Sequence, residues 1–259
     1  MFTDAALVNA CLPPVRIVRR RISPDSRLRG GVIALGNFDG FHRGHRLLVA
    51  RAQAAARGRR PVGVMSVEPH PREFFAPQGT MKRIALPAQK HAIAWRLGLD
   101  FIFEPRFDRA FAAITPEAFV ADVLHDDLGV SHIVTGADFR FGAGRSGGVD
   151  DLARLAARHG MTTEAVAHFG SFSSTGVREA LAKGDLRGAS HSLGRYWSAT
   201  ICEPVTHPAL APGLVRPPPG RYELADPITG RGFVAGLDGE GRILAGEPCP
   251  PEAVFLRAL

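Results

Sequence analysis

Cysteine is scarce in this sequence, and long apolar runs are missing. Cys11, Cys202 and Cys249 lie far apart and form neither a CxxC pair nor a cysteine–histidine pattern. This spacing argues against a disulfide framework and a zinc site, so we interpret the three residues as reduced thiols. No apolar run reaches the ~18 residues that span a bilayer, and residues 1–10 lack the basic and apolar segments of a signal peptide. A cytoplasmic protein is therefore expected.

Lysine is also scarce, because only Lys82, Lys90 and Lys183 occur and arginine supplies nearly all of the positive charge behind the net +7. A basic protein can bind nucleic acid. The arginines here, however, are spread over the whole chain without interleaved aromatic residues, and the densest run, Arg19–Arg21, is typical of a solvated surface segment. We therefore expect an anionic small molecule as the partner, and neither nucleic acid nor a membrane.

What the sequence does contain is an alternation of strands and helices. Its 259 residues, 45% of them hydrophobic, suffice for one α/β domain of ordinary size and a small addition. Apolar runs followed by helical spacing predict strand–helix units from Gly31 onward, with a further edge strand at 16–22. This order is typical of a Rossmann-like, doubly wound parallel sheet. The expected strands are 31–36, 61–67, 99–103, 131–135 and 162–167, and the expected helices are 43–57, 86–97, 115–129, 149–159, 175–182 and 184–194.

The turn after the first strand carries the strongest functional signal. The buried run Val32–Leu35 leads into Gly36, the turn cluster 37–40, and then His42 and His45. Residues three apart share one face of a helix, so both imidazoles should point the same way near the helix N-terminus. Amide N–H groups and the helix dipole favour an anion there. The stretch therefore suits a polyphosphate.

Three more polar loops follow expected strands. The 68–75 segment begins Glu-Pro-His-Pro, and its two prolines exclude a helix interior or a central strand, so a rigid loop is expected. The segment 136–148 is rich in glycine and longer than a simple connection needs. The hydroxyl residues of 170–178 can cap a helix or, with Arg178, bind phosphate. Each signal alone is more often a turn, a loop or a cap, but a doubly wound sheet gathers all of them at one crevice.

At this point the motifs resemble a known family. Gly36–His45 looks like the HxGH motif of nucleotidylyltransferases, and Ser173–Arg178 resembles their SSTxxR motif. Together with Glu68–Pro71, Phe107–Phe111 and Gly136–Gly142, their order is similar to that of the prokaryotic bifunctional FAD synthetases. In that family an FMN adenylyltransferase module precedes a riboflavin kinase module. The resemblance covers roughly residues 30–196.

The resemblance implies roles for matching positions, with FMN and ATP as substrates and Mg²⁺ entering with ATP. The two histidines and an arginine would stabilise charge on the reacting phosphates, while Mg²⁺ would be bound largely through the phosphates of ATP and water. The implied catalytic residues are His42, His45 and Arg178; the implied ATP-binding residues are Gly36, Phe38, Asp39, Gly44, Ser173, Ser174 and Thr175; and the implied FMN-binding residues are Pro69, His70, Pro71, Asp138 and Phe139.

The sequence departs from this family after residue 196. We expect a nucleotidylyltransferase domain over 1–196 and a small β-rich appendage over 197–259, with strands at 220–225, 231–236 and 242–246. Ten of the 20 prolines lie in this last part, which is shorter than a riboflavin kinase module and lacks its Gly-Phe-Pro-Thr-Ala-Asn segment. Our hypothesis is that riboflavin kinase activity has been lost.

Two alternatives stay open. One is a nucleotidylyltransferase with another phosphate acceptor, since the HxGH and SSTxxR motifs are common to both activities. The other is a non-catalytic, regulatory descendant that binds flavin or nucleotide, which the shortened second module motivates. The intact phosphate motifs argue against the second alternative.

Overall fold

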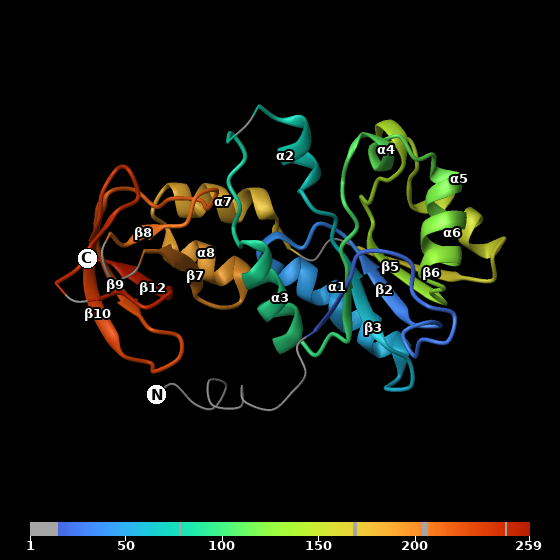
Figure 1. The fold of residues 1–259 in the computed structure, drawn as a ribbon, viewed down its shortest axis with the longest axis horizontal. Coiled ribbons are helices and arrows are strands. Elements are labelled where there is room, and N and C mark those ends of the chain that lie inside the picture. The colour runs from blue at the N-terminus through green and yellow to red at the C-terminus, as the bar shows by residue number, and fades with distance from the viewer. Residues whose placement is uncertain (1–14, 78, 168–169, 204–206, 247) are drawn as a thin grey trace.

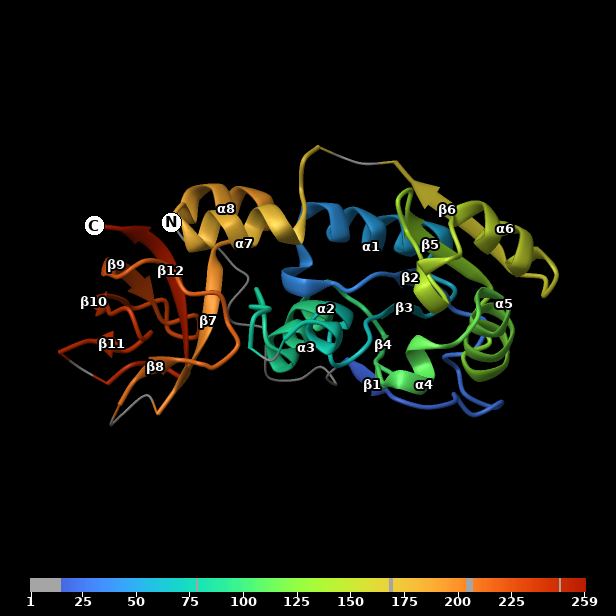
Figure 2. The same ribbon diagram turned by 90° about the horizontal axis from the view of Figure 1, so that it is seen from above.

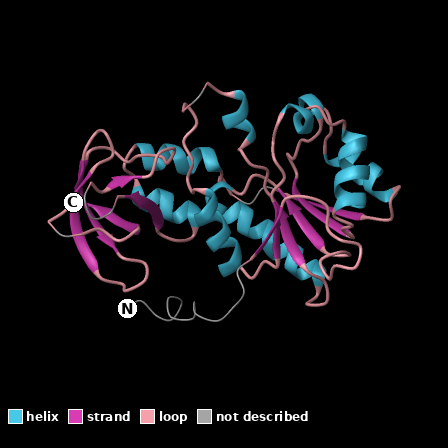
Figure 3. Cartoon of the chain, viewed as in Figure 1, coloured by secondary structure: helices cyan, strands magenta, loops and turns pink. Residues whose placement is uncertain are grey.

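The computed structural model describes residues 15–77, 79–167, 170–203, 207–246 and 248–259 (Figure 1). A parallel sheet and an antiparallel sheet lie at opposite ends of the molecule, with helices between them (Figure 3). The expectation for residues 1–10 and for Cys11 lies outside the described residues. Cys202 is exposed and Cys249 is buried. No helix in the described ranges is long and apolar enough to cross a membrane.

The first sheet has six strands in the order β1-β4-β3-β2-β5-β6, and every neighbouring pair is parallel. The expected doubly wound sheet is confirmed, including the edge strand near the start of the chain. Its strands are β1 (Arg16–Val18), β2 (Val32–Leu35), β3 (Val62–Met65), β4 (Phe101–Phe103), β5 (His132–Gly136) and β6 (Thr162–Val166).

Side chains alternate between the two faces of this sheet, as a strand requires. Val32 and Ala34 pack in the core beneath α1 (Arg43–Ala56) and α3 (Pro87–Arg96). Ile33 and Leu35 belong to the core of the other face, with the π-helix η2 (Phe119–Asp127) and α6 (Val149–Ala157). Burial of both faces explains why β2, β3 and β4 appear as continuous apolar runs, whereas the edge strand β6 is partly exposed.

Strand β2 lies at the switch point of the sheet. The chain proceeds from β2 to β3 and β4 on one side, then crosses to β5 and β6 on the other. In open α/β sheets, ligands bind outside the carboxyl ends of the strands at this point. The segments that follow β2, β3, β5 and β6 are the four loops singled out in the sequence.

Of two local expectations, the loop at 68–75 was wrong in detail, and the helix start at Thr115 is confirmed. The 68–75 loop contains a short helix, α2 (Pro71–Phe75), because proline is tolerated at the first helical position. The helix expected over 115–129 starts as α5 (Pro116–Ala118), with Thr115 accepting a hydrogen bond from the Ala118 amide, and continues as η2. The remaining short helices are η1 (Asp39–Phe41), α4 (Arg109–Ala112) and η3 (Ala143–Arg145).

The second sheet is antiparallel and closes on itself. Its order is β11-β10-β9-β12-β7-β8, and an antiparallel bridge from Ala209 to Arg242 joins the two ends. The Leu210 amide donates to the Gly241 carbonyl at 2.8 Å, and that contact makes the sheet a small barrel. The three expected strands are present, but three others were missed. The strands are β7 (Trp197–Cys202), β8 (Ala209–Leu210), β9 (Gly220–Ala225), β10 (Gly232–Leu237), β11 (Ile243–Leu244) and β12 (Glu252–Ala258).

Helices α7 (Ser174–Ala182) and α8 (Leu186–Leu193) lie between the sheets, as Figure 2 shows. Their apolar faces share one core with the barrel, in which Leu181 and Leu193 join Trp197 and Phe255. Helix α7, whose N-cap and first turns form the SSTxxR-like motif, is therefore supported by the barrel. A domain boundary at residue 196 stays a prediction.

Candidate active site

The two histidines of the first turn stack on each other. His42 is the N-cap of α1, and its Nδ1 accepts a hydrogen bond from the His45 amide at 3.4 Å. The ring centroids are 3.7 Å apart with an interplanar angle of 24°, so the expectation that both rings share one face is confirmed. Because Nδ1 of His42 accepts, the neutral ring carries its proton on Nε2, where it can donate to a ligand.

The backbone before the histidines is tightly folded. Phe38, Gly40 and Phe41 have positive φ values of 50°, 74° and 46°. The fully buried Phe38 ring lies 4.9 Å from the His45 ring, and a side chain at Gly44 would come within 3.2 Å of the His42 ring. A Cβ at Gly36 would similarly meet the Phe38 ring at 3.2 Å. The structure thus makes Phe38 a support for His45, and a side chain at position 44 would press on the His42 ring.

Burial and neighbouring positive charge keep the histidines neutral. Burial, and then Arg178, lower the pKa of His42 to about 4. The pKa of His45 is lowered well below its ordinary value by burial and then by His42, His70 and Arg178. The pKa of His70 falls to about 3, first through burial. At neutral pH these rings are hydrogen-bonding groups, and Arg178 supplies the positive charge beside them.

Arg178 is held by Asp39, which the sequence placed only in the ATP pocket. An Arg178 Nη atom donates to the Asp39 carboxylate at 2.6 Å, and Arg178 Nε donates to the Lys82 carbonyl at 2.8 Å. The same carboxylate accepts from the amides of Ile84 and Ala85 at 3.1 Å. Asp39 is 5% exposed, so it orients the guanidinium.

The hydroxyl residues at the start of α7 have different partners. Ser173 is the N-cap, and its Oγ accepts from the Gly176 amide at 3.1 Å. Ser174 Oγ donates to the Asp39 carbonyl at 3.2 Å, which brings the N-terminus of α7 beside the first turn. Thr175 Oγ1 accepts from Arg72 at 3.4 Å. The two predicted phosphate-binding segments therefore meet in space.

The 68–75 loop brings a third histidine to the pair. His70 follows Pro69, is 7% exposed, and caps α2 by accepting from the Arg72 amide at 3.1 Å. After burial, the positive charge of Arg178 is the next cause of the lowered pKa of His70. His70 in turn contributes to the lowered pKa of His45. Pro71 is the first residue of α2.

A buried network of charges, which the sequence analysis missed, anchors this loop. Lys90 is 4% exposed, and its Nζ donates to Ser66 Oγ at 2.9 Å and to Glu68 Oε2 at 3.1 Å. Arg83 pairs with Glu68 and also donates from Nε to Glu73 at 2.9 Å. Burial raises the pKa of Glu68, but the hydrogen bond from Arg83 and the charge of Lys90 outweigh it, and the pKa lies below its ordinary value. The sequence signal for this network was the position of Lys90, which lies at helical spacing from the buried Ile93 and Ala94 of α3.

Aromatic rings join the two segments predicted to bind flavin. Phe74 lies 5.3 Å from Phe107 between ring centroids, and Phe139 stacks on Phe141 at 5.9 Å. Phe75 is 71% exposed, and Asp138 is exposed as well. A continuous series of ring contacts connects α2 to the 136–142 loop through Phe74, Phe107, Phe111, Phe119, Phe141 and Phe139.

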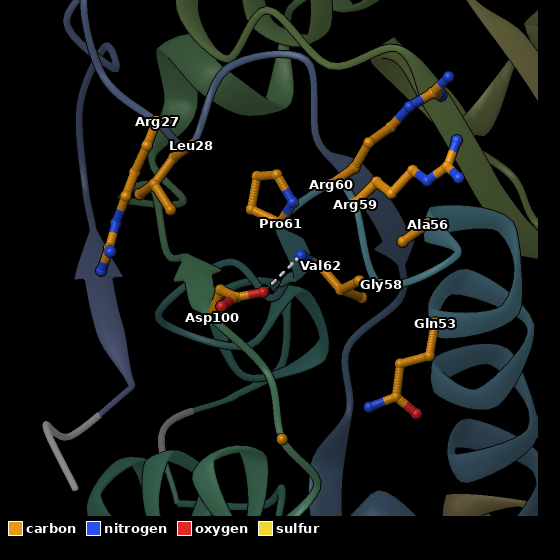
Figure 4. A pocket seen from close by; sticks show the side chains of 11 residues that line it. Arg27, Leu28, Gln53, Ala56, Gly58, Arg59, Arg60, Pro61, Val62 and Asp100 are labelled. Carbon is orange, nitrogen blue, oxygen red and sulfur yellow. Dashed lines mark hydrogen bonds between the residues drawn. The ribbon is translucent and has the colours of Figure 1, made fainter.

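Two hollows bear on the choice of site. A small one beside the histidines is lined by residues that include Asp39, Glu68, His70 and Lys90. A larger one of about 440 Å³ lies at the amino end of β3, where the Val62 amide donates to Asp100 (Figure 4). This larger hollow lies at the amino end of β3, whereas the loops described above follow the carboxyl ends of the strands. Within the described ranges, no three His, Cys, Asp or Glu side chains are grouped to hold a metal ion.

Comparison with known proteins agrees with this geometry. The family model described as FAD synthetase matches residues 25–178. The chain belongs to the FAD synthetase family. A bifunctional riboflavin kinase/FMN adenylyltransferase of Escherichia coli K12 is 40% identical over 170 residues, 64% of this chain and 54% of that protein. An FAD synthetase of Listeria monocytogenes is 31% identical over 185 residues, 69% of this chain and 74% of that protein.

The match to the FAD synthetase family is partial in length. The chain covers 54% to 55% of the first bifunctional relatives, from Escherichia coli and Pseudomonas fluorescens. One solved structure, described as a macrolide-efflux protein from Streptococcus pneumoniae, has a TM-score of 0.78 at 20% identity and covers 95% of this chain and 91% of that chain. At this identity the likeness concerns the fold alone, and its coverage includes both the parallel sheet and the barrel.

Proposed function

We propose that this chain transfers the adenylyl group of ATP to FMN. An oxygen of the FMN phosphate attacks the α-phosphorus of ATP, the bond to the β-phosphate breaks, and FAD and pyrophosphate are formed. The observation that carries the proposal is the stacked pair His42 and His45 beside Arg178 at the switch point of the sheet. The family of the chain supports it.

The reaction needs alignment and neutralisation more than proton transfer. The attacking phosphate oxygen is already an anion, so no strong general base is required. His42, with its proton on Nε2, and His45 donate hydrogen bonds to the phosphates as charge spreads in the transition state. Arg178 and the N-termini of α1 and α7 hold the departing pyrophosphate, together with Ser173, Ser174 and Thr175.

Mg²⁺ enters this proposal as part of the Mg·ATP substrate. The carboxylate beside the histidines, Asp39, already accepts from Arg178 and two backbone amides. Such a carboxylate has little capacity left for a metal ion. Mg²⁺ commonly binds through substrate phosphates and water, which suits this donor set.

FMN is assigned to the side of the crevice formed by the 68–75 and 136–142 loops. Pro69, His70 and Pro71 shape one wall, and Asp138 and Phe139 belong to the other. Aromatic rings between these walls offer stacking area for the isoalloxazine. Exposed Phe75 is the ring most accessible to a planar ligand.

We further infer that the barrel has no riboflavin kinase activity. The support is the missing Gly-Phe-Pro-Thr-Ala-Asn segment, in whose place the chain contains Ala211–Tyr222. Purified protein incubated with riboflavin and Mg·ATP should form no FMN. Formation of FMN would overturn this inference and leave the adenylyltransferase proposal intact.

One assay separates the proposed activity from its alternatives. The protein is incubated with FMN, α-labelled ATP and Mg²⁺, and labelled FAD and pyrophosphate are measured. Formation of both supports the proposal. Tight binding of FMN without turnover favours a regulatory binding protein, whereas pyrophosphate release only with another phosphate acceptor favours a different nucleotidylyltransferase.

A further inference from the structure

The segment 82–85 lies between the candidate ATP site and the C-terminal barrel. On one side its backbone holds the charged pair of the site: the amides of Ile84 and Ala85 donate to Asp39, and the Lys82 carbonyl accepts from Arg178. These three contacts fix where the Arg178 guanidinium points. Any displacement of the segment would therefore displace the cation assigned to the leaving pyrophosphate.

The barrel holds the same segment from the other side. The Arg83 amide donates to the Gly213 carbonyl at 2.7 Å, and the Val215 amide donates back to the Arg83 carbonyl at 2.9 Å. Trp197 Nε1 donates to the Ile84 carbonyl at 2.9 Å. Trp197 is 1% exposed, so this hydrogen bond is fully buried. The backbone of 82–85 thus forms hydrogen bonds to the site and to the barrel at the same time.

Side-chain packing follows the same path. Ile84 is fully buried in the core that contains Trp197 and Leu214. A Cβ added to Gly40 would lie 2.5 Å from the Ile84 side chain, so Ile84 packs directly under the turn that carries Asp39. Arg195, which lies between α8 and the first barrel strand β7, also contacts this turn by donating to the Gly40 carbonyl at 3.1 Å.

We propose that the barrel is a positioning element for the ATP-phosphate site. Trp197 and the backbone of 213–215 hold residues 82–85, and residues 82–85 hold Asp39 and Arg178. This role explains how a module can contribute to the activity without a reaction of its own. The inference rests on the proposed function only in assigning Arg178 to the phosphates of ATP.

Trp197→Phe tests the proposal, although phenylalanine is smaller than tryptophan and leaves a small buried void at this position. It removes the Nε1–H donor but keeps an aromatic ring against Phe255, whose centroid is 5.0 Å away. Tyr222→Phe is the matched control: Tyr222 is 3% exposed, contacts the same Phe255 ring, and donates to a backbone carbonyl, that of Pro218. Both variants lose one hydrogen bond in the barrel, but only the first loses a contact to 82–85.

The readout is the dissociation constant of Mg·ATP in the absence of FMN, measured by calorimetry at a temperature where all variants are folded. We expect Trp197→Phe to weaken ATP binding about three- to tenfold, as the loss of one positioning hydrogen bond implies. Tyr222→Phe should leave it within about 1.5-fold of the parent, because the lost hydroxyl donates to the Pro218 carbonyl and to no atom of residues 82–85. Equal dissociation constants for the two variants would overturn the proposal.

A second measurement uses the unaltered chain and does not depend on a variant that folds. Coupling between sites is reciprocal, so Mg·ATP should slow amide hydrogen exchange at Val215 as well as at Ile84 and Ala85. Protection confined to the histidine turn would contradict the positioning role. Neither measurement requires turnover, so failure to form FAD would refute the proposed function while leaving this inference to be judged by ATP binding.

Discussion

Arg178 donates to Asp39 at 2.6 Å across a sequence separation of 139 residues. This contact joins the N-terminus of α7 to the turn that follows β2. It also links the two motifs that resemble HxGH and SSTxxR, because Asp39 in the first segment orients Arg178 in the second. The roles of Asp39 and Arg178 can therefore be tested together.

Asp39→Asn should keep the fold and weaken ATP binding at least about tenfold, the equivalent of one charge-assisted hydrogen bond of about 1.5–3 kcal/mol. The asparagine Oδ1 can still accept from the amides of Ile84 and Ala85, but the side chain no longer neutralises Arg178. The KM for ATP and the melting temperature are measured together. The control is Glu164→Gln, which breaks the ion pair with the exposed Arg51. If Asp39→Asn binds ATP like the control, Asp39 does not orient Arg178.

Lys90→Met should destabilise the protein by about 1–3 kcal/mol, because it removes the buried cation shared by Glu68 and Glu104, which keep their contacts to Arg83 and to His91 and Arg19. Lys90 contacts Glu68 at 3.1 Å and Glu104 at 3.5 Å. Release of the 68–75 loop should raise the KM for FMN more than the KM for ATP. Urea unfolding and steady-state kinetics measure the two effects, with exposed Lys183→Met as the control. A larger change in the KM for ATP would contradict the assignment of this loop to FMN.

Phe75→Ala should weaken FMN binding about tenfold, because stacking area for the flavin is lost. The variant should be as stable as the parent protein, since Phe75 is 71% exposed. Quenching of FMN fluorescence on titration with protein gives the dissociation constant. Ile228→Ala, an equally exposed apolar change in the barrel, should leave FMN binding unchanged. Unaltered binding by Phe75→Ala would place the flavin elsewhere.

Stability should fall as the pH drops from about 6.5 toward 4. Burial lowers the pKa of His42 to about 4 and that of His70 to about 3. The unfolded chain, with histidine pKa values near ~6.5, then binds more protons than the folded protein in this window. Each of these histidines should cost about 2 kcal/mol at pH 5 relative to pH 8.

Comparison of two variants isolates the histidine contribution from that of the carboxylates. His70→Asn should reduce the loss of unfolding free energy between pH 8 and pH 5, measured with urea. His207→Asn changes a side chain that is 83% exposed and should keep the parent slope. Identical slopes for both variants would mean that His70 is not buried in its neutral form.

The sequence was informative where local patterns decide the structure. The apolar run 32–35, the two histidines at a spacing of three, and Thr115 before Pro116 predicted a buried strand, a shared face and a helix start, and all three are confirmed. Such features depend on neighbours within one or two turns. The helix at 71–75 was missed because a proline that ends one helix can begin another.

Long-range partners could not be predicted in the same way. Asp39 is held by Ile84 and Ala85, more than forty residues away, and no local pattern marks that contact. Strand β12 has the sequence Glu-Ala-Val-Phe-Leu-Arg-Ala, which suits a helix as well as a strand, and its pairing with β7 and β9 decides the outcome. The closed barrel therefore emerged only from the structure.

The central claim is that the His42–His45 pair serves transfer of AMP to FMN. It is tested most directly by the rate of labelled FAD formation from FMN and α-labelled ATP, for the parent protein and for His45→Ala. The account predicts turnover by the parent protein and a decrease of about 100-fold or more for His45→Ala, because one group that stabilises the transition state is lost. Absence of FAD from the parent reaction, or near-normal turnover by a folded His45→Ala protein, would contradict it.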